Sequence, residues 1–223
     1  MANAEGIILF GASQHAAYAV DIIEAQGIYT IRGIIDENLP QGSDFAGYPV
    51  LGNDAFFQVN CQSLGLNQGL VCIGDNYVRT KVARKISETN PAFEFVTAVH
   101  PSVVLGKWSS LGQGTLIMAG AIVGTNTSVG DHCFIATNAS IDHDSILGNG
   151  SSISAASVVG GGCHIGSGTS ITMGCIVLHK VSVGDNSVIG SGALVNKNIP
   201  NNVVAYGSPA RIIRSREAHD SYL

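Results

Sequence analysis

His143 stands between two carboxylates, in the segment Asp142-His143-Asp144. A carboxylate beside an imidazole fixes its tautomer and raises its basicity, so this pattern is typical of a general base. A surface histidine next to an aspartate is also common without a catalytic role, and the local sequence leaves both interpretations open. The chain contains neither a Gly-x-Ser-x-Gly nucleophile motif nor a phosphate-binding P-loop. The candidate chemistry is therefore proton transfer by His143.

The segment around His143 repeats every six residues. Every sixth residue is aliphatic in one unbroken run: Leu105, Leu111, Ile117, Val123, Val129, Ile135, Ile141, Leu147, Ile153, Val159, Ile165, Ile171, Val177, Val183, Ile189 and Val195. A small or β-branched residue precedes each of them by two positions. Neither an α-helix nor an antiparallel strand holds this phase, whereas a hexapeptide β-helix does, with about eighteen residues in each triangular coil. We predict about five such coils.

The period assigns neighbours to His143. His179 has the same phase two coils later, and Gly161 lies between them at that phase. We expect a groove beside His143 that is floored by glycine, where an extended ligand contacts backbone groups. Three other histidines are interpreted as structural: His132, His164 and His179.

Glycine follows the aliphatic residue directly in many repeats. These glycines are Gly106, Gly112, Gly124, Gly130, Gly148, Gly160, Gly166, Gly184 and Gly190. Either a positive φ or a close approach of neighbouring coils favours a residue without Cβ there, and the sequence does not decide between the two.

The first hundred residues predict a small α/β domain with a mostly parallel sheet. Apolar runs indicate strands over 7–10, 31–35, 48–52, 69–73 and 93–99, and helical spacing indicates helices over 16–25, 54–61 and 77–88. The Gly-x-Gly-x-x-Gly pattern of dinucleotide sites does not match. Loops that follow parallel strands meet at one edge of a sheet, where they bind phosphate, base or sugar. The loop residues concerned are Gly11, Ser13, His15, Asp36, Glu37 and Gly74-Asp75-Asn76.

The chain leaves the repeat at Asn196–Pro200 and has one more extended piece over Val203–Tyr206. Gly207-Ser208-Pro209-Ala210-Arg211 then predicts a rigid turn into a tail with Arg211, Arg214 and Arg216. This tail is either a solvated end or a site for a phosphorylated ligand.

The 223-residue chain carries a formal net charge of -5, whereas surfaces that bind nucleic acid or anionic membranes are basic. No apolar stretch reaches the roughly eighteen residues of a membrane-spanning helix, and the N-terminal segment lacks a signal-peptide pattern. Five cysteines (Cys61, Cys72, Cys133, Cys163 and Cys175) without CxxC spacing favour buried thiols in a reducing compartment. We therefore expect a cytoplasmic protein that binds neither nucleic acid nor membranes.

The chain resembles the left-handed β-helix acyltransferases over nearly its whole length. More narrowly, it resembles the bacterial sugar acyltransferases that include sialic acid O-acetyltransferases and the N-acetyltransferases of nucleotide-linked 4-amino-sugars. The residues that carry the resemblance are Gly11-Ala12-Ser13-Gln14-His15, Ile73-Gly74-Asp75-Asn76 with Arg79, His100-Pro101-Ser102, Asn138-Ala139-Ser140-Ile141-Asp142-His143-Asp144 and Gly207-Ser208-Pro209-Ala210.

The resemblance implies three parts and an assembly. These parts are a Rossmann-like nucleotide-sugar-binding domain over 1–98, a left-handed β-helix over 99–206 and a tail over 207–223 that contacts the coenzyme. It also implies a homotrimer with active sites between subunits, with acetyl-CoA as cosubstrate and no metal.

The resemblance also implies roles for single residues. His143 matches the catalytic base, with Asp144 as its carboxylate. The nucleotide sugar is expected at Gly11, Ser13, Gln14, His15, Asp36, Glu37, Gly74 and Asn76, and acetyl-CoA at Asn138, Ser152, Gly161, Gly162, Gly190, Pro209, Ala210, Arg211 and Arg214. The chain departs from the family pattern at Gln14, where glycine is usual, and at Ser152, where some relatives have a histidine.

The leading hypothesis is an acetyl-CoA-dependent N-acetyltransferase of a nucleotide-linked 4-amino-4,6-dideoxy-sugar in bacterial surface-glycan biosynthesis. The alternatives are an O-acetyltransferase of sialic acid or a related sugar, a γ-type carbonic anhydrase, and a non-catalytic binder of nucleotide sugars. A carbonic anhydrase needs three zinc-binding histidines, and the paired histidine spacing is missing.

Overall fold

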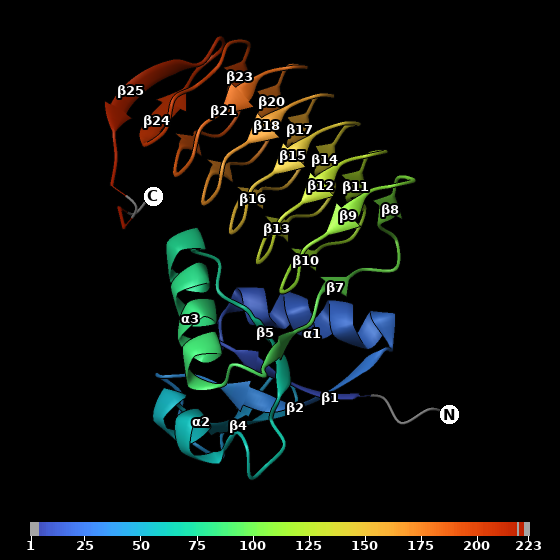
Figure 1. Ribbon diagram of the computed structural model, residues 1–223, viewed down its shortest axis with the longest axis vertical. Coiled ribbons are helices and arrows are strands. Elements are labelled where there is room, and N and C mark those ends of the chain that lie inside the picture. Colours follow the sequence, from blue (N-terminus) through green and yellow to red (C-terminus); the bar gives the residue numbers. More distant parts are fainter. Residues whose placement is uncertain (1–4, 218, 221–223) are drawn as a thin grey trace. The chain divides into compact units, whose positions relative to one another are not determined.

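A computed structural model describes residues 5–217 and 219–220 of the chain. The chain divides into two compact units, Met1–Pro101 and Ser102–Leu223. The first is a small α/β domain and the second is a β-helix (Figure 1).

The N-terminal unit is a mostly parallel sheet with three helices, as the sequence predicts. Its elements are β1 (Glu5–Phe10), α1 (Gln14–Gln26), β2 (Tyr29–Ile35), β3 (Asp44–Phe45), β4 (Tyr48–Gly52), α2 (Asp54–Asn60), β5 (Gln68–Val71), α3 (Asn76–Thr89), β6 (Glu94–Phe95) and β7 (Ala98–Val99). The strands lie in the order β3-β4-β2-β1-β5-β6, and only β3 and β4 pair antiparallel. Right-handed crossovers put α1 on one face of this sheet, and α2 and α3 on the other.

Alternation along β1 builds the core on both faces of the sheet. Ile8 and Phe10 belong to a buried cluster that includes Phe57 of α2 and Ile86 of α3. The rings of Phe10 and Phe57 meet edge to face with their centroids 5.0 Å apart. The intervening Ile7 is also fully buried, because successive side chains of a strand point to opposite faces.

Two elements of this unit differ from the sequence prediction. The short strand β3 was not expected. The single strand predicted over 93–99 is two strands, β6 and β7, because pairing with β5 ends once the Val96 N–H has donated to the Gly69 carbonyl.

The second unit confirms the six-residue repeat. Its two-residue strands β8 to β23 are Val104–Leu105, Ser110–Leu111, Leu116–Ile117, Ile122–Val123, Ser128–Val129, Phe134–Ile135, Ser140–Ile141, Ile146–Leu147, Ser152–Ile153, Val158–Val159, His164–Ile165, Ser170–Ile171, Ile176–Val177, Ser182–Val183, Val188–Ile189 and Leu194–Val195. Each strand ends on the predicted aliphatic residue. These side chains point inward, and nearly all of them are buried.

Every third strand stacks in register to form the walls of the β-helix. One wall has the order β23-β20-β17-β14-β11-β8, the second β21-β18-β15-β12-β9, and the third runs from β24 through β22, β19, β16 and β13 to β10. Paired residues on neighbouring coils are eighteen apart in sequence, as in the parallel pairing of Val123 with Ile141. The coil length predicted from the sequence is therefore confirmed.

The bends decide which glycines need a positive φ. The third residue after each aliphatic from Leu105 to Ile189 is left-handed, for example Asn126 (φ 59), Asp144 (φ 55) and Gly162 (φ 68). The glycine directly after the aliphatic is selected for another reason: a Cβ on Gly124 would lie 2.7 Å from the backbone N of His143 on the next coil. Close approach of coils, and not positive φ, explains the glycine at that phase.

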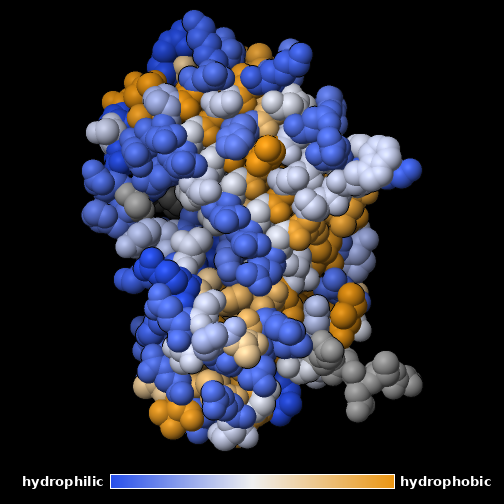
Figure 2. All heavy atoms as spheres, in the orientation of Figure 1, coloured by the Kyte–Doolittle hydropathy of each residue, from blue (hydrophilic) through white to orange (hydrophobic). Residues whose placement is uncertain are grey.

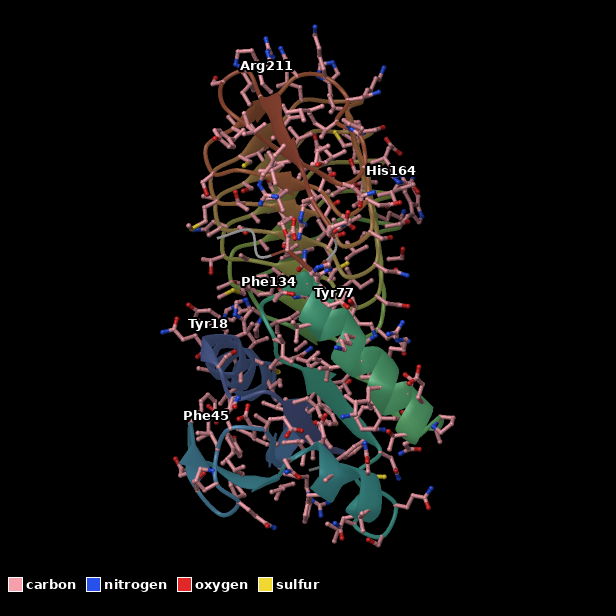
Figure 3. The ribbon with its side chains drawn as sticks, turned by 90° about the vertical axis from the view of Figure 1, so that its left-hand side faces the viewer. Tyr18, Phe45, Tyr77, Phe134, His164 and Arg211 are labelled. Atoms are coloured by element: carbon pink, nitrogen blue, oxygen red, sulfur yellow. The ribbon has the colours of Figure 1, made fainter. Side chains whose placement is uncertain are left out.

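The chain after the β-helix ends in a hairpin. Strand β24 (Val203–Tyr206) pairs antiparallel with β25 (Arg211–Ser215), and the Ser208–Pro209 peptide bond between them is cis. Figure 3 shows Arg211 at the C-terminal end of the β-helix. The sequence predicts a turn here but not β25, because all five of its residues are exposed and lack an alternating apolar pattern.

Candidate active site

His143 lies in the bend between β14 (Ser140–Ile141) and β15 (Ile146–Leu147). Its Nδ1 is 2.7 Å from Oδ2 of Asp144, and its backbone N–H donates to Oδ1 of Asp142 at 2.8 Å. The Nε2 atom is 4.0 Å from Oδ2 of Asp142, which is beyond hydrogen-bond distance. The two carboxylates predicted around His143 are thus used differently, one by the ring and the other by the backbone.

This geometry sets the protonation of the imidazole. The hydrogen bond to Asp144 raises the pKa of His143 above 6.5, and the charge of Asp142 adds to this effect. In neutral His143, Nδ1–H donates to Asp144, and the lone pair of Nε2 is left for a ligand. The side chain of His143 is 60% exposed, so an outside molecule can reach the imidazole.

Gly161 forms the floor under the imidazole. A Cβ at Gly161 would lie 2.5 Å from Nε2 of His143 and 2.7 Å from its Cε1, so the ring occupies the place of a side chain. The next residue, Gly162, donates its N–H to the carbonyl of His143 at 2.8 Å. The predicted glycine floor beside His143 is therefore present one coil away, against the ring itself.

Asn126 is a site residue that the sequence analysis missed. Its Nδ2 donates to Oδ1 of Asp144 at 2.7 Å, from the preceding coil. This hydrogen bond is the first cause, and the bond from His143 the second, of a pKa of Asp144 below its usual value. The signal was present in the sequence, because residues one coil apart differ by eighteen and Asn126 is eighteen positions before Asp144.

Most residues expected to bind acetyl-CoA lie away from this bend. Asn138 lies in the preceding bend with φ 56, and Ser152 is buried in β16, where its hydroxyl lies 3.4 Å from that of Ser170. Others lie close to or within the terminal hairpin: Gly190, Pro209, Ala210, Arg211 and Arg214. Within the β-helix unit, the bend of His143 brings together only Gly161 and Gly162 from the expected coenzyme set.

The two arginines of the hairpin differ in what they contact. Arg214 forms an ion pair with Asp220 at 3.3 Å, so part of its charge is engaged within the chain. Arg211 donates from Nη1 to the carbonyl of Ala210 at 2.9 Å. Of the two, Arg211 is the better candidate for a phosphate contact.

In the N-terminal unit, the strand order reverses beside β1, which lies between β2 and β5. Ligands of parallel α/β sheets bind at the carboxyl ends of strands at such a point. The loop after β1 begins with Gly11, whose φ of 100 and nearness to Cys72 O exclude a side chain. Ser13 caps α1 by accepting from His15 N at 3.2 Å, and its hydroxyl donates to the carbonyl of Cys72 at 3.3 Å.

His15 and Gly74, from the loops after β1 and β5, lie against each other. A Cβ at Gly74 would lie 2.5 Å from Cε1 of His15. Burial and the nearby Arg79 cation lower the pKa of His15, which favours its neutral imidazole. Arg79 itself is buried and donates to the carbonyls of Ile73 and Gly74 and to Oδ1 of Asn76.

The carboxylates of the second loop already hold backbone groups. Asp36 accepts from Ala12 N at 2.8 Å with one oxygen and from Asn38 N and Leu39 N with the other. Glu37 accepts from Asp54 N at the start of α2. Gln14, the first residue of α1, is exposed. The loop residues predicted to bind the nucleotide sugar thus meet at one edge of the sheet, except that Glu37 contacts α2.

Two further observations concern the rest of the chain. Among the residues described, no group of three or more His, Cys, Asp or Glu side chains is arranged to hold a metal ion. None of the described helices is long and apolar enough to cross a membrane.

Family comparisons agree with the two units. Residues 6–86 match the PglD N-terminal domain family, and residues 109–143 and 162–197 match the bacterial transferase hexapeptide family. The chain is 31% identical in sequence to a histidine-to-alanine variant of GDP-perosamine N-acetyltransferase from Caulobacter crescentus. The structure of that variant was solved in complex with CoA and GDP-perosamine. The match covers 94% of this chain and 97% of that one, with a TM-score of 0.89. The chain belongs to the PglD/PerB family of sugar N-acetyltransferases.

A second relative supports the same membership for this acetyltransferase. The acetyltransferase domain of PglB from Neisseria gonorrhoeae is 26% identical, with a TM-score of 0.85, and the match covers 94% of this chain and all of that domain. The same domain has also been solved in complex with acetyl coenzyme A. Comparison with curated protein sequences gives no significant match.

Proposed function

We propose that the protein transfers an acetyl group from acetyl-CoA to the amino group of a nucleotide-linked 4-amino-4,6-dideoxy-sugar in bacterial surface-glycan biosynthesis. His143 is the general base of this reaction, and the enzyme works in the cytoplasm. Five free, buried cysteines agree with a reducing compartment.

One observation carries the proposal more than any other. His143 is fixed by Asp144 through Nδ1 at 2.7 Å, and its side chain is 60% exposed. This pair lies on a β-helix whose 31%-identical relative was solved with CoA and a nucleotide-linked amino sugar. In two structures of that relative, one histidine is replaced by alanine or by asparagine. These variants agree with a functional role for a histidine in that protein.

The reaction follows from the chemistry of these groups. The neutral amine of the sugar attacks the thioester carbonyl carbon while Nε2 of His143 takes a proton from the amine nitrogen. The C–S bond then breaks, and the thiolate of CoA leaves with the proton that His143 gained. The products are the N-acetylated sugar and free CoA, and His143 returns to its neutral form.

The negative charge on the carbonyl oxygen needs a hydrogen-bond donor in the intermediate. Of the two amides under the ring, Gly162 N–H already donates to His143 O. For the Gly161 N–H, the described part of the chain shows no acceptor. We therefore assign the stabilisation of the oxyanion to Gly161 N–H, on the coil after that of His143.

The nucleotide part of the acceptor belongs, in this proposal, to the edge of the sheet in the N-terminal unit. The N-terminus of α1 lies next to Gly11 and Ser13, and the positive end of its helix dipole favours a diphosphate there. The coenzyme belongs to the β-helix unit, where Arg211 supplies a positive charge at its C-terminal end.

The proposed homotrimer has an apolar surface to bury. Outward-facing side chains on the wall of β8, β11, β17 and β20 form a stripe, which we define as Val104, Ile122, Val158 and Ile176, each between 44% and 57% exposed. Figure 2 shows apolar side chains on this side of the β-helix. Ser140 of β14 interrupts the stripe between Ile122 and Val158, three residues before His143, so a second copy packed on the stripe would build a wall of the active site.

Sedimentation tests the assembly. We expect a trimer for the wild type and dissociation for Ile122→Glu, because this substitution puts a charge in the stripe. An active monomer of 23.0 kDa would contradict the proposal.

Turnover tests the reaction. Acetyl-CoA is combined with UDP-, dTDP- and GDP-linked 4-amino-sugars and with free sialic acid, and thiol release and the acetylated product are followed. We expect thiol release and N-acetylation with one or more nucleotide amino sugars. Turnover of sialic acid alone would support O-acetylation instead. Zinc bound in stoichiometric amount would favour a carbonic anhydrase, and tight sugar binding without binding of acetyl-CoA would indicate a non-catalytic protein.

A further inference from the structure

Asn126 and Asp144 occupy equivalent positions on two successive coils. Both have left-handed backbone conformations, with φ 59 and φ 55, and both backbone N–H groups donate to the coil before them at 3.0 Å. Nδ2 of Asn126 donates to Oδ1 of Asp144 at 2.7 Å, and the other oxygen of Asp144 is 2.7 Å from Nδ1 of His143. The two contacts use different oxygens, so together they fix the plane of one carboxylate.

The pair of His143 and Asp144 needs such support because it is exposed. The two side chains are 60% and 57% accessible, and an exposed ion pair loses much of its energy to side-chain freedom and to solvent. A neutral amide holds the carboxylate in place without cancelling its charge. Asparagine also adopts the left-handed conformation more readily than most residues do.

We infer that Asn126 is a positioning residue, which orients Asp144 so that Nδ1 of His143 is held and Nε2 faces the sugar amine. The inference rests on the proposed function of His143. It extends the site to a third residue from the preceding coil, which touches neither the substrate nor the imidazole.

Asp142 and Asp144 are the charged neighbours of His143 at this corner of the β-helix. At the same corner, the preceding coil presents Thr125 and Asn126, and the following coil presents Gly161 and Gly162, none of which is charged. A change in the titration of His143 after substitution of Asn126 therefore reports on Asp144 or Asp142, and Asp142 Oδ1 is held by the backbone N–H of His143.

The chain supplies a matched control for a merely structural role. Asn186 is also left-handed, with φ 51, and its Nδ2 donates to Oδ1 of Asn202 on the next coil at 2.7 Å. This pair has the same geometry as Asn126 with Asp144 but lies in a bend without His143. Glycine is the substitution of choice at both positions, because it removes the amide and tolerates positive φ.

The experiment compares Asn126→Gly with Asn186→Gly in the full-length protein. The pKa of the His143 imidazole is measured by NMR, and kcat is measured with a nucleotide amino sugar as a function of pH. For Asn126→Gly we expect a lower pKa of His143, a kcat lowered about tenfold and an unchanged KM for acetyl-CoA. For Asn186→Gly we expect none of these changes and a similar effect on stability.

Two more variants sharpen the test. Asn126→Asp keeps the size and backbone preference but places a second carboxylate beside Asp144, so kcat should fall further than in Asn126→Gly. In a His143→Ala background, Asn126→Gly should cause no additional loss of kcat. An unchanged pKa of His143 in Asn126→Gly, or equal shifts in both glycine variants, would overturn the inference. Because the NMR titration needs no turnover, it separates this outcome from a failure of the proposed reaction, which would show as wild-type activity in His143→Ala.

Discussion

The bend around His143 and the loop edge of the N-terminal sheet use their polar side chains in different ways. In the bend, Asn126 donates to Asp144 and Asp144 holds Nδ1 of His143, so this series of hydrogen bonds ends at the exposed imidazole. At the sheet edge, Asp36 and Ser13 are engaged with backbone groups of their own loops and of the neighbouring loops. The β-helix thus presents an oriented imidazole, whereas the sheet edge presents backbone groups held in place by side chains. The proposed function accordingly assigns chemistry to the β-helix unit and recognition to the N-terminal unit.

The largest effect that this comparison predicts is at His143. His143→Ala should lower kcat by about 10²-fold or more, because a general base contributes roughly 10² to 10⁴ in rate. The affinity for acetyl-CoA should change little, which equilibrium binding can check. If turnover stayed at the wild-type level, His143 would not be the base.

Gly161→Ala should have the next largest effect. The φ of Gly161 is outside the left-handed region, and the new Cβ would meet only the end of the His143 side chain. The ring must move, and a shift of about 1 Å in a reacting group can cost on the order of 10²-fold in rate. We expect kcat to fall by about that factor with an unchanged Tm. A second measurement in the His143→Ala background should show no further loss, and a further loss would assign Gly161 another role.

At the sheet edge, Asp36→Ala should act on recognition and not on chemistry. Loss of a hydrogen bond to a charged group costs about 1.5–3 kcal/mol, so the KM for the nucleotide sugar should rise roughly ten- to a hundredfold. The KM for acetyl-CoA should barely move. Asp44→Ala is the matched control, because Asp44 also accepts from a backbone N–H within its own loop, that of Gly47 at 3.2 Å. Equal effects of Asp36→Ala on both substrates would make the N-terminal unit a structural support.

The smallest effect is expected at the hairpin. Arg211→Ala should raise the KM for acetyl-CoA a few-fold and spare the sugar, and the effect should shrink at high salt because exposed charges are screened. Arg214→Ala should raise the KM for acetyl-CoA less, since Asp220 already pairs with Arg214. KM values at low and high ionic strength test this order. A larger effect of Arg214→Ala would show that the ion pair opens when coenzyme binds.

The β-helix was predictable from the sequence because its period fixes contacts as well as strands. Once the coil is known to hold eighteen residues, Gly161 follows as the neighbour of His143, and Asn126 could have been found in the same way. The sequence could not show that Asn126 donates to the carboxylate, since that depends on side-chain rotamers.

The N-terminal unit and the hairpin were less predictable for local reasons. The order of strands and helices follows from apolar runs. The direction in which Asp36 points is set by three backbone N–H groups that donate to its carboxylate, those of Ala12, Asn38 and Leu39. Strand β25 has no buried residue, so hydrophobic periodicity gives no signal for it.

The central claim is that His143, held by Asp144, takes the proton from the amine. The pH dependence of kcat in the wild type and in Asp144→Asn tests it most directly. Asp144 raises the pKa of His143, so the wild type should lose activity as the pH falls through a value above 6.5. Asp144→Asn removes the main cause of this shift, and the loss should then occur at lower pH, with a reduced maximal kcat. The ionisation of the sugar amine cannot produce this movement, because the substrate is the same in both measurements. A profile that falls at the same pH in both proteins would contradict the account.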